Sequence, residues 1–113
     1  MQKTDKIRIA NYVYPKERDS DCYEIGIYLA TDGKRWKYGI DQWWGKNGED
    51  GGWASESELK YKSQHDAAKD AFNNIIVSLM AMHDGETAVA FKHMYTDYLQ
   101  GRTRLPGAQL SLF

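Results

Sequence analysis

The first half of the chain alternates apolar and polar residues, as half-buried strands do. Between residues 6 and 14, Ile7, Ile9 and Val13 alternate with Arg8 and Tyr12. This period of two predicts a strand with Ile7, Ile9 and Val13 on one face. Pro15 and the polar residues that follow it predict that the strand ends in a turn.

Two further β-rich runs, residues 22–31 and 34–44, flank the dipeptide Asp32-Gly33. This dipeptide favours a two-residue type I′ turn, because both residues tolerate positive φ. Such a turn places Thr31 opposite Lys34 and fixes the register of the hairpin. The pairs predicted on one face are Leu29 with Trp36, Ile27 with Tyr38, and Ile25 with Ile40. The pairs predicted on the other face are Ala30 with Arg35, Tyr28 with Lys37, Gly26 with Gly39, and Glu24 with Asp41.

The predicted pairing of Gly26 with Gly39 leaves a spot without side chains in the sheet. Strand glycines often mark a strongly twisted or bulged point, and we interpret this pair in that way. The alternative is a place where another backbone lies close.

The segment after the hairpin contains the glycine-rich stretch of residues 45–53, which predicts a loop. It does not have the spacing of a phosphate-binding loop. Residues 54–61 fit either a polar edge strand or a short helical turn, so the sequence leaves a fourth strand open.

The second half of the chain has helical periodicity. Ser63 followed by Asp66 suits a helix start, and Asp84-Gly85 suits its end. The apolar positions of this helix are Ala68, Ala71, Phe72, Ile75, Ile76, Leu79 and Met82. A second helix is predicted from about residue 86 to 100, and its apolar positions are Ala88, Phe91, Tyr95, Tyr98 and Leu99.

Strands followed by helices predict an α+β domain over residues 1–101. We expect an antiparallel sheet of three strands, or four with residues 54–61, followed by two helices packed on it. Residues 102–113 are expected to form an extended, flexible tail, because residues 102–108 suit neither a helix nor a strand.

Composition and charge exclude several classes of protein. The 113 residues carry a formal charge of −1, which excludes a strongly basic nucleic-acid coat. The single cysteine, Cys22, cannot form an internal disulfide, and this favours a reducing, cytoplasmic location. No apolar run has the length of a membrane span, and the first ten residues lack a signal-peptide core.

The residues that most often carry catalysis form no recognisable pattern. His65, His83 and His93 lie at helical positions and do not have the spacing of zinc ligands. Asp41 and the pair Glu49-Asp50 are interpreted as solvated acids near the loop. We therefore expect no metal site, no cofactor and no enzymatic activity.

Basic and aromatic residues gather around the hairpin and the loop. Core packing explains the tryptophans most simply. Consecutive strand residues face opposite sides, however, so Trp43 and Trp44 cannot both enter one core. The alternative is a surface that stacks on the bases of DNA or RNA. Its candidate residues are Lys34, Arg35, Lys37, Trp43, Trp44 and Lys46.

The last five residues of the sequence are Gln109, Leu110, Ser111, Leu112 and Phe113. They resemble, at all five positions, the consensus peptide by which bacterial proteins bind the β sliding clamp of the replicative DNA polymerase. The resemblance covers these five residues alone. It implies that Leu112 and Phe113 are the anchors, Leu110 is a secondary contact, and Gln109 forms the specifying hydrogen bonds.

The sequence therefore predicts a non-enzymatic interaction protein that binds the clamp through its tail. Its role would be that of a replication or repair accessory, or of a competitor such as a small phage or plasmid regulator. The resemblance also implies two binding sites for each clamp, because these clamps are dimeric rings. Alternatives are the nucleic-acid-binding domain described above and an assembly protein whose tail packs on a neighbouring subunit.

Overall fold

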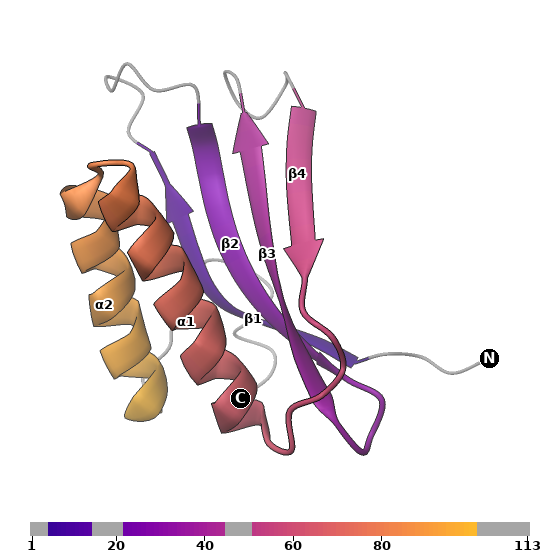
Figure 1. Ribbon diagram of the computed structural model, residues 1–113. Helices are drawn as coiled ribbons and strands as arrows, with labels where there is room; N and C mark the ends of the chain where they lie inside the picture. The colour runs from indigo at the N-terminus through magenta and orange to yellow at the C-terminus, as the bar shows by residue number, and fades with distance from the viewer. Residues whose placement is uncertain (1–4, 15–21, 45–50, 102–113) are drawn as a thin grey trace.

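A computed structural model of the chain describes residues 5–14, 22–44 and 51–101 (Figure 1). Four antiparallel strands pair in the order β1-β2-β3-β4, and two helices follow them. The elements are β1 (Asp5–Val13), β2 (Cys22–Thr31), β3 (Trp36–Trp44), β4 (Gly51–Glu56), α1 (Gln64–Ala81) and α2 (Gly85–Leu99). This order confirms the predicted α+β class. The predicted tail, residues 102–113, lies outside the described residues.

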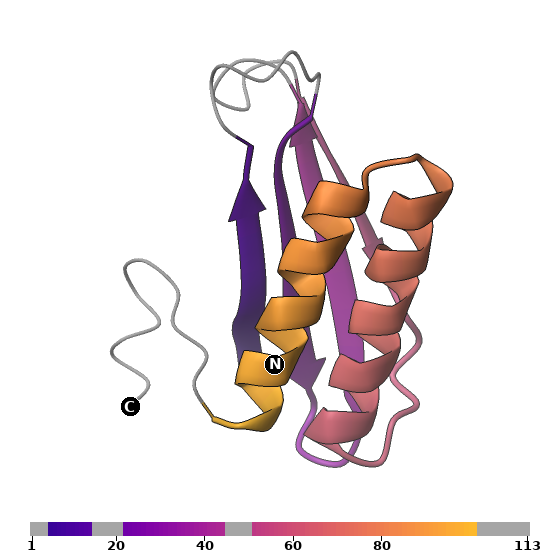
Figure 2. The ribbon, with the colours of Figure 1, turned by 90° about the vertical axis from the view of Figure 1, so that its left-hand side faces the viewer.

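Both helices lie on the same face of the sheet (Figures 1 and 2). Helix α1 packs against β2 and β3, and α2 packs beside α1 and against β1. The second helix therefore contacts both the first helix and the sheet.

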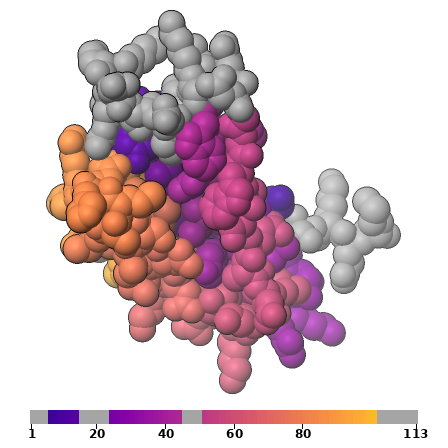
Figure 3. Space-filling model, turned by 45° about the horizontal axis from the view of Figure 1, so that its top comes forward, coloured from indigo at the N-terminus to yellow at the C-terminus, as the bar shows by residue number. Residues whose placement is uncertain are grey.

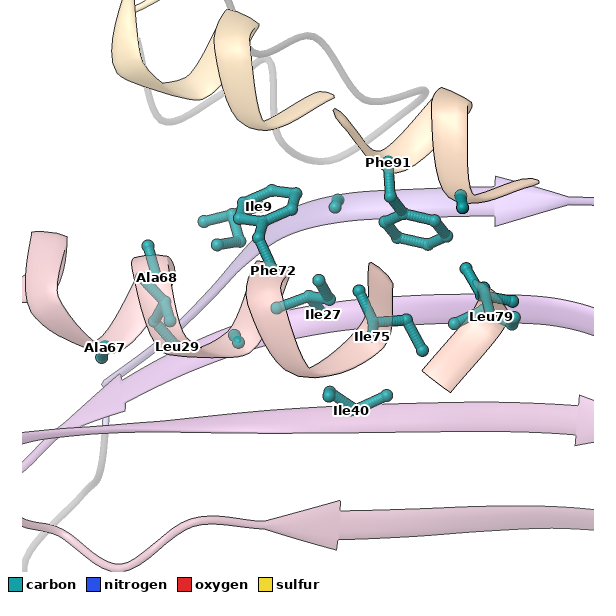
Figure 4. Packing of buried hydrophobic residues seen from close by; sticks show 14 of the residues in the cluster. Ile9, Ile27, Leu29, Ile40, Ala67, Ala68, Phe72, Ile75, Leu79 and Phe91 are labelled. Atoms are coloured by element: carbon teal, nitrogen blue, oxygen red, sulfur yellow. The ribbon is translucent and has the colours of Figure 1, made fainter. Parts of the chain in front are cut away.

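The core lies between this helix pair and the inner face of the sheet (Figure 4). Phe72 and Phe91 are its two largest fully buried side chains, one from each helix. Ile25, Ile27 and Leu29 line the sheet beneath them. Small residues of α1 bring the helix close to the strands, and these are Ala67, Ala68 and Ala71.

The fourth strand resolves the ambiguity of residues 54–61. Strand β4 begins at Gly51, so the loop prediction is wrong for residues 51–53, and residues 54–56 complete the strand. The chain then continues towards the β2–β3 turn. Two backbone hydrogen bonds of 2.8 and 3.0 Å join Trp36 to Tyr61 just before α1 begins. The edge-strand interpretation is therefore confirmed for the first part of this segment.

The hairpin turn differs from the prediction. Trp36, not Lys34, lies opposite Thr31, so four residues form the loop. The Asp32 carboxylate explains the longer loop, because its Oδ1 accepts hydrogen bonds of 2.9 Å from the backbone N–H groups of Lys34 and Arg35. These bonds lower the pKa of Asp32. Gly33 has a φ of 98°, a conformation that favours glycine.

The longer loop moves every predicted pair of β2 and β3 by two residues. Leu29 pairs with Tyr38, and Ile27 pairs with Ile40. Because side chains alternate with a period of two, this shift keeps every residue on its predicted face. The predicted pairing of Gly26 with Gly39 is wrong, however: Gly26 pairs with Asp41, and Tyr28 pairs with Gly39.

A β-bulge changes the phase of β1. The register shifts between Arg8 and Ala10, so one extra residue is inserted at Ile9. After the bulge, Tyr12 faces the core, where its ring centroid lies 6.3 Å from that of Phe91. Val13 is 48% exposed, and its predicted inward position is therefore wrong.

The helix start at Ser63 is confirmed, because its Oγ accepts a hydrogen bond of 3.1 Å from the N–H of Asp66. Helix α1 ends earlier than predicted, at Ala81, and His83 takes the left-handed conformation with a φ of 59°. Asp84 caps α2, accepting a bond of 3.3 Å from the N–H of Thr87.

Two residues predicted to lie on the apolar helix faces are exposed. Met82 follows the last residue of α1, and its side chain is 60% exposed. Leu99 is the last residue of α2 and is also exposed. Both predictions extended the helical periodicity to the end of a helix, where the neighbouring layer no longer covers it.

Replacing Phe72 with alanine should lower the free energy of unfolding by about 3–5 kcal/mol, because it leaves a cavity where the helices and the sheet meet. Urea denaturation would measure this loss. Val77→Ala on the exposed side of α1 is the matched control, with an expected change within about 0.5 kcal/mol. Equal losses in the two variants would contradict this account of the core.

Candidate functional site

The sheet face opposite the helices carries polar and aromatic side chains from all four strands, and we call it the open face. Within residues 5–14, 22–44 and 51–101, no helix lies on it (Figure 1). Strand alternation assigns to it Lys6, Arg8, Asn11, Val13, Glu24, Tyr28, Lys37, Asp41, Trp43, Ala54 and Glu56.

An ion pair crosses β2 near the middle of the open face. Arg8 of β1 donates two hydrogen bonds of 3.2 and 3.0 Å to the Asp41 carboxylate of β3. The bond to Asp41 raises the pKa of the Arg8 guanidinium. Gly26 makes the crossing possible, because a Cβ there would overlap the guanidinium. The amide oxygen of Asn11 is buried beside this pair and has no hydrogen-bond partner among the described residues.

A second network joins β1 to β4. The ring of Tyr28 lies over Gly39, and its hydroxyl donates to the Glu56 carboxylate. Lys37 Nζ lies 3.1 Å from the other carboxylate oxygen of Glu56. Lys6 Nζ lies 4.8 Å from the centre of the Tyr28 ring, in cation–π geometry. Hydrogen bonds from Tyr28 and Lys37 lower the pKa of Glu56, whereas desolvation raises the pKa of Tyr28.

The tryptophans around the loop lie on both faces of the sheet. Trp43 lies on the open face with its ring over Gly52 of β4, and it is 43% exposed. Trp44 belongs to the opposite face, as strand alternation predicts. Trp53 also belongs to that opposite face, opposite Gln42, and is 51% exposed.

The described candidates for nucleic-acid binding do not form one cluster: Lys37 and Trp43 share the open face, but Trp44 belongs to the opposite face. Lys34 and Arg35 lie in the β2–β3 turn, whereas Trp43 lies near the other end of β3 (Figure 1). The six-residue separation of Lys37 and Trp43 corresponds to roughly 20 Å along the strand. Lys37 is paired with Glu56, and Lys46 lies outside the described residues.

The charge of the open face is balanced. Among the described residues, its basic side chains are those of Lys6, Arg8 and Lys37, and its acidic side chains are those of Glu24, Asp41 and Glu56. An equal number of opposite charges gives little attraction for a phosphate backbone.

The residues considered for catalysis or metal binding also lie apart. His65 stacks on Tyr98, with ring centroids 6.5 Å apart. Asp41 is held by Arg8, and Glu49-Asp50 lies outside the described residues. Across the described residues, no group of three His, Cys, Asp or Glu side chains could hold a metal ion.

Neither of the two described helices is long and apolar enough to cross a membrane.

Comparison of the chain with known protein families, curated proteins and solved structures found no match.

Sequence reasoning missed the polar networks of the open face. The strand glycines could have indicated these networks. A neighbouring side chain lies over each of Gly26, Gly39 and Gly52. Glycine in a strand often marks a place where another group approaches closely. The approaching groups could not be named from the sequence, because the pairs depend on the hairpin register and on the bulge in β1.

Replacing Glu56 with glutamine should destabilise the protein near neutral pH, where the carboxylate accepts hydrogen bonds from Tyr28 and Lys37. The pKa of Glu56 is lower in the folded protein than its ordinary value of 4.5. The unfolded chain therefore binds this proton first as the pH falls, and the stabilisation is lost as the pH drops through the folded-state pKa.

Urea denaturation at several pH values would compare the wild type with Glu56→Gln. The difference in unfolding free energy should be full above pH 4.5 and should shrink towards zero in more acidic solution. Glu58→Gln is the matched control, because it removes the same charge from an exposed residue just after β4. A difference that stays constant with pH would contradict the role of the ionised carboxylate.

Proposed function

We propose that this chain is an interaction protein that binds a bacterial β sliding clamp through residues 109–113. It would act as an accessory of replication or repair, or as a competitor of other clamp ligands. The five-position match of the pentapeptide to the clamp-binding consensus carries the proposal. The pentapeptide lies outside the described residues, so its support is the sequence, together with the end of helix α2 at Leu99.

The described domain ends in a way that suits a separate binding segment. Helix α2 finishes at Leu99, and the N–H of Gln100 donates to the carbonyl groups of Thr96 and Asp97. Gly101 follows with a φ of 69°.

The spacing between the domain and the pentapeptide is sufficient for binding at a distance. Seven residues, 102–108, separate Gly101 from Gln109. Fully extended, seven residues span at most about 25 Å. A clamp could therefore bind the pentapeptide without displacing α2.

The chemistry of the pentapeptide suits a preformed apolar site. Burial of Leu112 and Phe113 would contribute about 2–3 kcal/mol each. The Gln109 amide can both donate and accept hydrogen bonds with partner backbone. Ordering a short peptide offsets part of this gain, so we expect a dissociation constant near the micromolar range.

Isothermal titration calorimetry with a purified bacterial β clamp tests the proposal. The full chain should bind with micromolar affinity, and Phe113→Ala should weaken binding by at least about tenfold, because burying this ring provides much of the free energy. The matched control keeps the composition of residues 109–113 but reverses their order, and it should not bind. A synthetic QLSLF peptide should compete with the full chain for the same site.

Two results would reject the proposal. One is the absence of binding by the full chain. The other is equal binding by the chain with the reversed pentapeptide, which would move the interaction to another part of the protein.

A further inference from the structure

Strand β4 forms one edge of the sheet, and this edge is exposed along its whole length. Each of the residues Gly51–Glu56 is exposed. Among the described strands, β4 pairs only with β3. In the space-filling view β4 lies at the rim of the molecule, on the side away from α2 (Figure 3). The backbone groups on its outer side therefore face solvent rather than another described strand.

The alternation of backbone hydrogen bonds identifies these outward groups. Ser57, which follows β4, donates its N–H to the carbonyl of Tyr38 over 2.9 Å. In an antiparallel ladder every second residue bonds to the same neighbour. Ser55, Trp53 and Gly51 thus direct their N–H and C=O groups to β3. The outward-directed groups belong to Gly52, Ala54 and Glu56.

The β4 edge is short and carries Glu56, but it lacks the basic residues, the proline and the bulge that protect many edge strands. Its sequence, GGWASE, contains no proline, lysine or arginine. Its pairing with β3 runs from Gly39–Glu56 to Trp44–Gly51 without a register shift. The opposite edge, β1, has both a bulge and the basic residues Lys6 and Arg8. Natural sheets use such features to prevent pairing with another chain, and β4 is open to it.

We propose that the β4 edge binds the β4 edge of a second copy of this chain in antiparallel orientation. The three outward residues are spaced evenly about Ala54. A two-fold axis at Ala54 therefore pairs Ala54 with Ala54 of the second copy, and Gly52 with its Glu56. This register uses every outward N–H and C=O of Gly52, Ala54 and Glu56, giving about six hydrogen bonds. The product is one continuous sheet with four strands from each chain.

The side chains of β4 are compatible with this register. Gly52 and Ala54 add little bulk of their own on the open face, where the Trp43 ring of the same chain covers Gly52. Glu56 is already held by Tyr28 and Lys37 of its own chain. The two Glu56 residues lie four positions apart along the ladder, roughly 14 Å, so they do not repel strongly. On the other face, half-exposed Trp53 gains Ser55 of the second copy as a neighbour.

A second copy suits this edge because the register places each large side chain opposite a small one, Glu56 opposite Gly52 and Trp53 opposite Ser55. The three outward residues provide donors and acceptors at equal spacing on either side of the axis. Six residues per chain make a small interface, so we expect a weak dimer with a dissociation constant on the order of 0.1 mM or tighter.

Sedimentation velocity of the full chain over a range of concentrations tests the proposal. The wild type should shift with concentration from the 13.0 kDa monomer towards twice that mass. Ala54→Pro removes one outward N–H and leaves the bonds to β3 in place, so it should remain monomeric. Ala54→Val keeps the N–H group and should still dimerise. A wild type that stays monomeric up to about 1 mM would overturn the proposal.

A second variant disrupts the same contact and keeps the result interpretable if the proline variant does not fold. Ala54→Lys keeps the backbone but brings two like charges together at the axis, and it should also be monomeric. Circular dichroism and thermal melting of each variant would verify the fold. Dimerisation by folded Ala54→Lys equal to that of the wild type would reject the β4 interface.

Cross-linking tests the register itself. In a Cys22→Ser background, Ala54→Cys should form an intermolecular disulfide, because paired Cα atoms lie about 5.5 Å apart. Glu58→Cys is the matched control: it lies past the end of β4, far from its copy, and should cross-link much more slowly. Equal rates for the two cysteines would contradict the register.

The dimer and the clamp proposal are tested separately. A chain truncated after residue 108 should still dimerise, and Ala54→Pro should still bind the clamp at one site. Loss of self-association on truncation would overturn the β4 interface in favour of assembly through the tail.

Discussion

The packing of α1 across the inner face of β2 and β3 is the interaction on which the rest of the structure depends. Phe72 and Leu79 of the helix are fully buried together with Ile27 and Leu29 of β2. A one-residue slip of β2 would turn these strand residues to solvent and lose their burial, about 2 kcal/mol for each side chain. The helix therefore fixes which residues of each strand face inward. By exclusion it also fixes the composition of the open face.

The open face is stabilised differently from the core. Its side chains are too polar to form an apolar layer, and they instead reach across neighbouring strands over glycines. Arg8 reaches Asp41 over Gly26, and Tyr28 reaches Glu56 over Gly39. Each glycine thus has a partner whose side chain occupies the space that a Cβ would fill. These bridges connect β1 to β3 and β2 to β4, and they join the strands on a face that no described helix covers.

The fold was predictable to the extent that local periodicity determines it. The helices, the Ser63 cap and the inner faces of β2 and β3 follow from the spacing of residues near one another in sequence. The hairpin register was not predictable from Asp32-Gly33 alone, because the Asp32 carboxylate favours a longer loop by accepting two backbone N–H groups. The bulge at Ile9 was invisible for a similar reason: it depends on pairing with β2. The open-face networks depend on both features. The sequence could therefore single out the strand glycines, but it could not identify the side chains that lie over them.

The two proposed interactions use different groups of the chain, and for that reason they can form at the same time. The pentapeptide would bind through side chains, chiefly Leu112 and Phe113, whereas the β4 edge would bind through backbone groups. Each alone is weak, because five or six residues bury little surface. A pair of chains joined through β4 would carry two pentapeptides, and the second would then bind a dimeric clamp at an effective concentration set by residues 102–108 rather than by diffusion. Affinity would rise without any new contact, provided that the two tails span the distance between the clamp sites. A weak dimer is sufficient for this purpose, because binding of both tails would itself stabilise the paired edges by mass action.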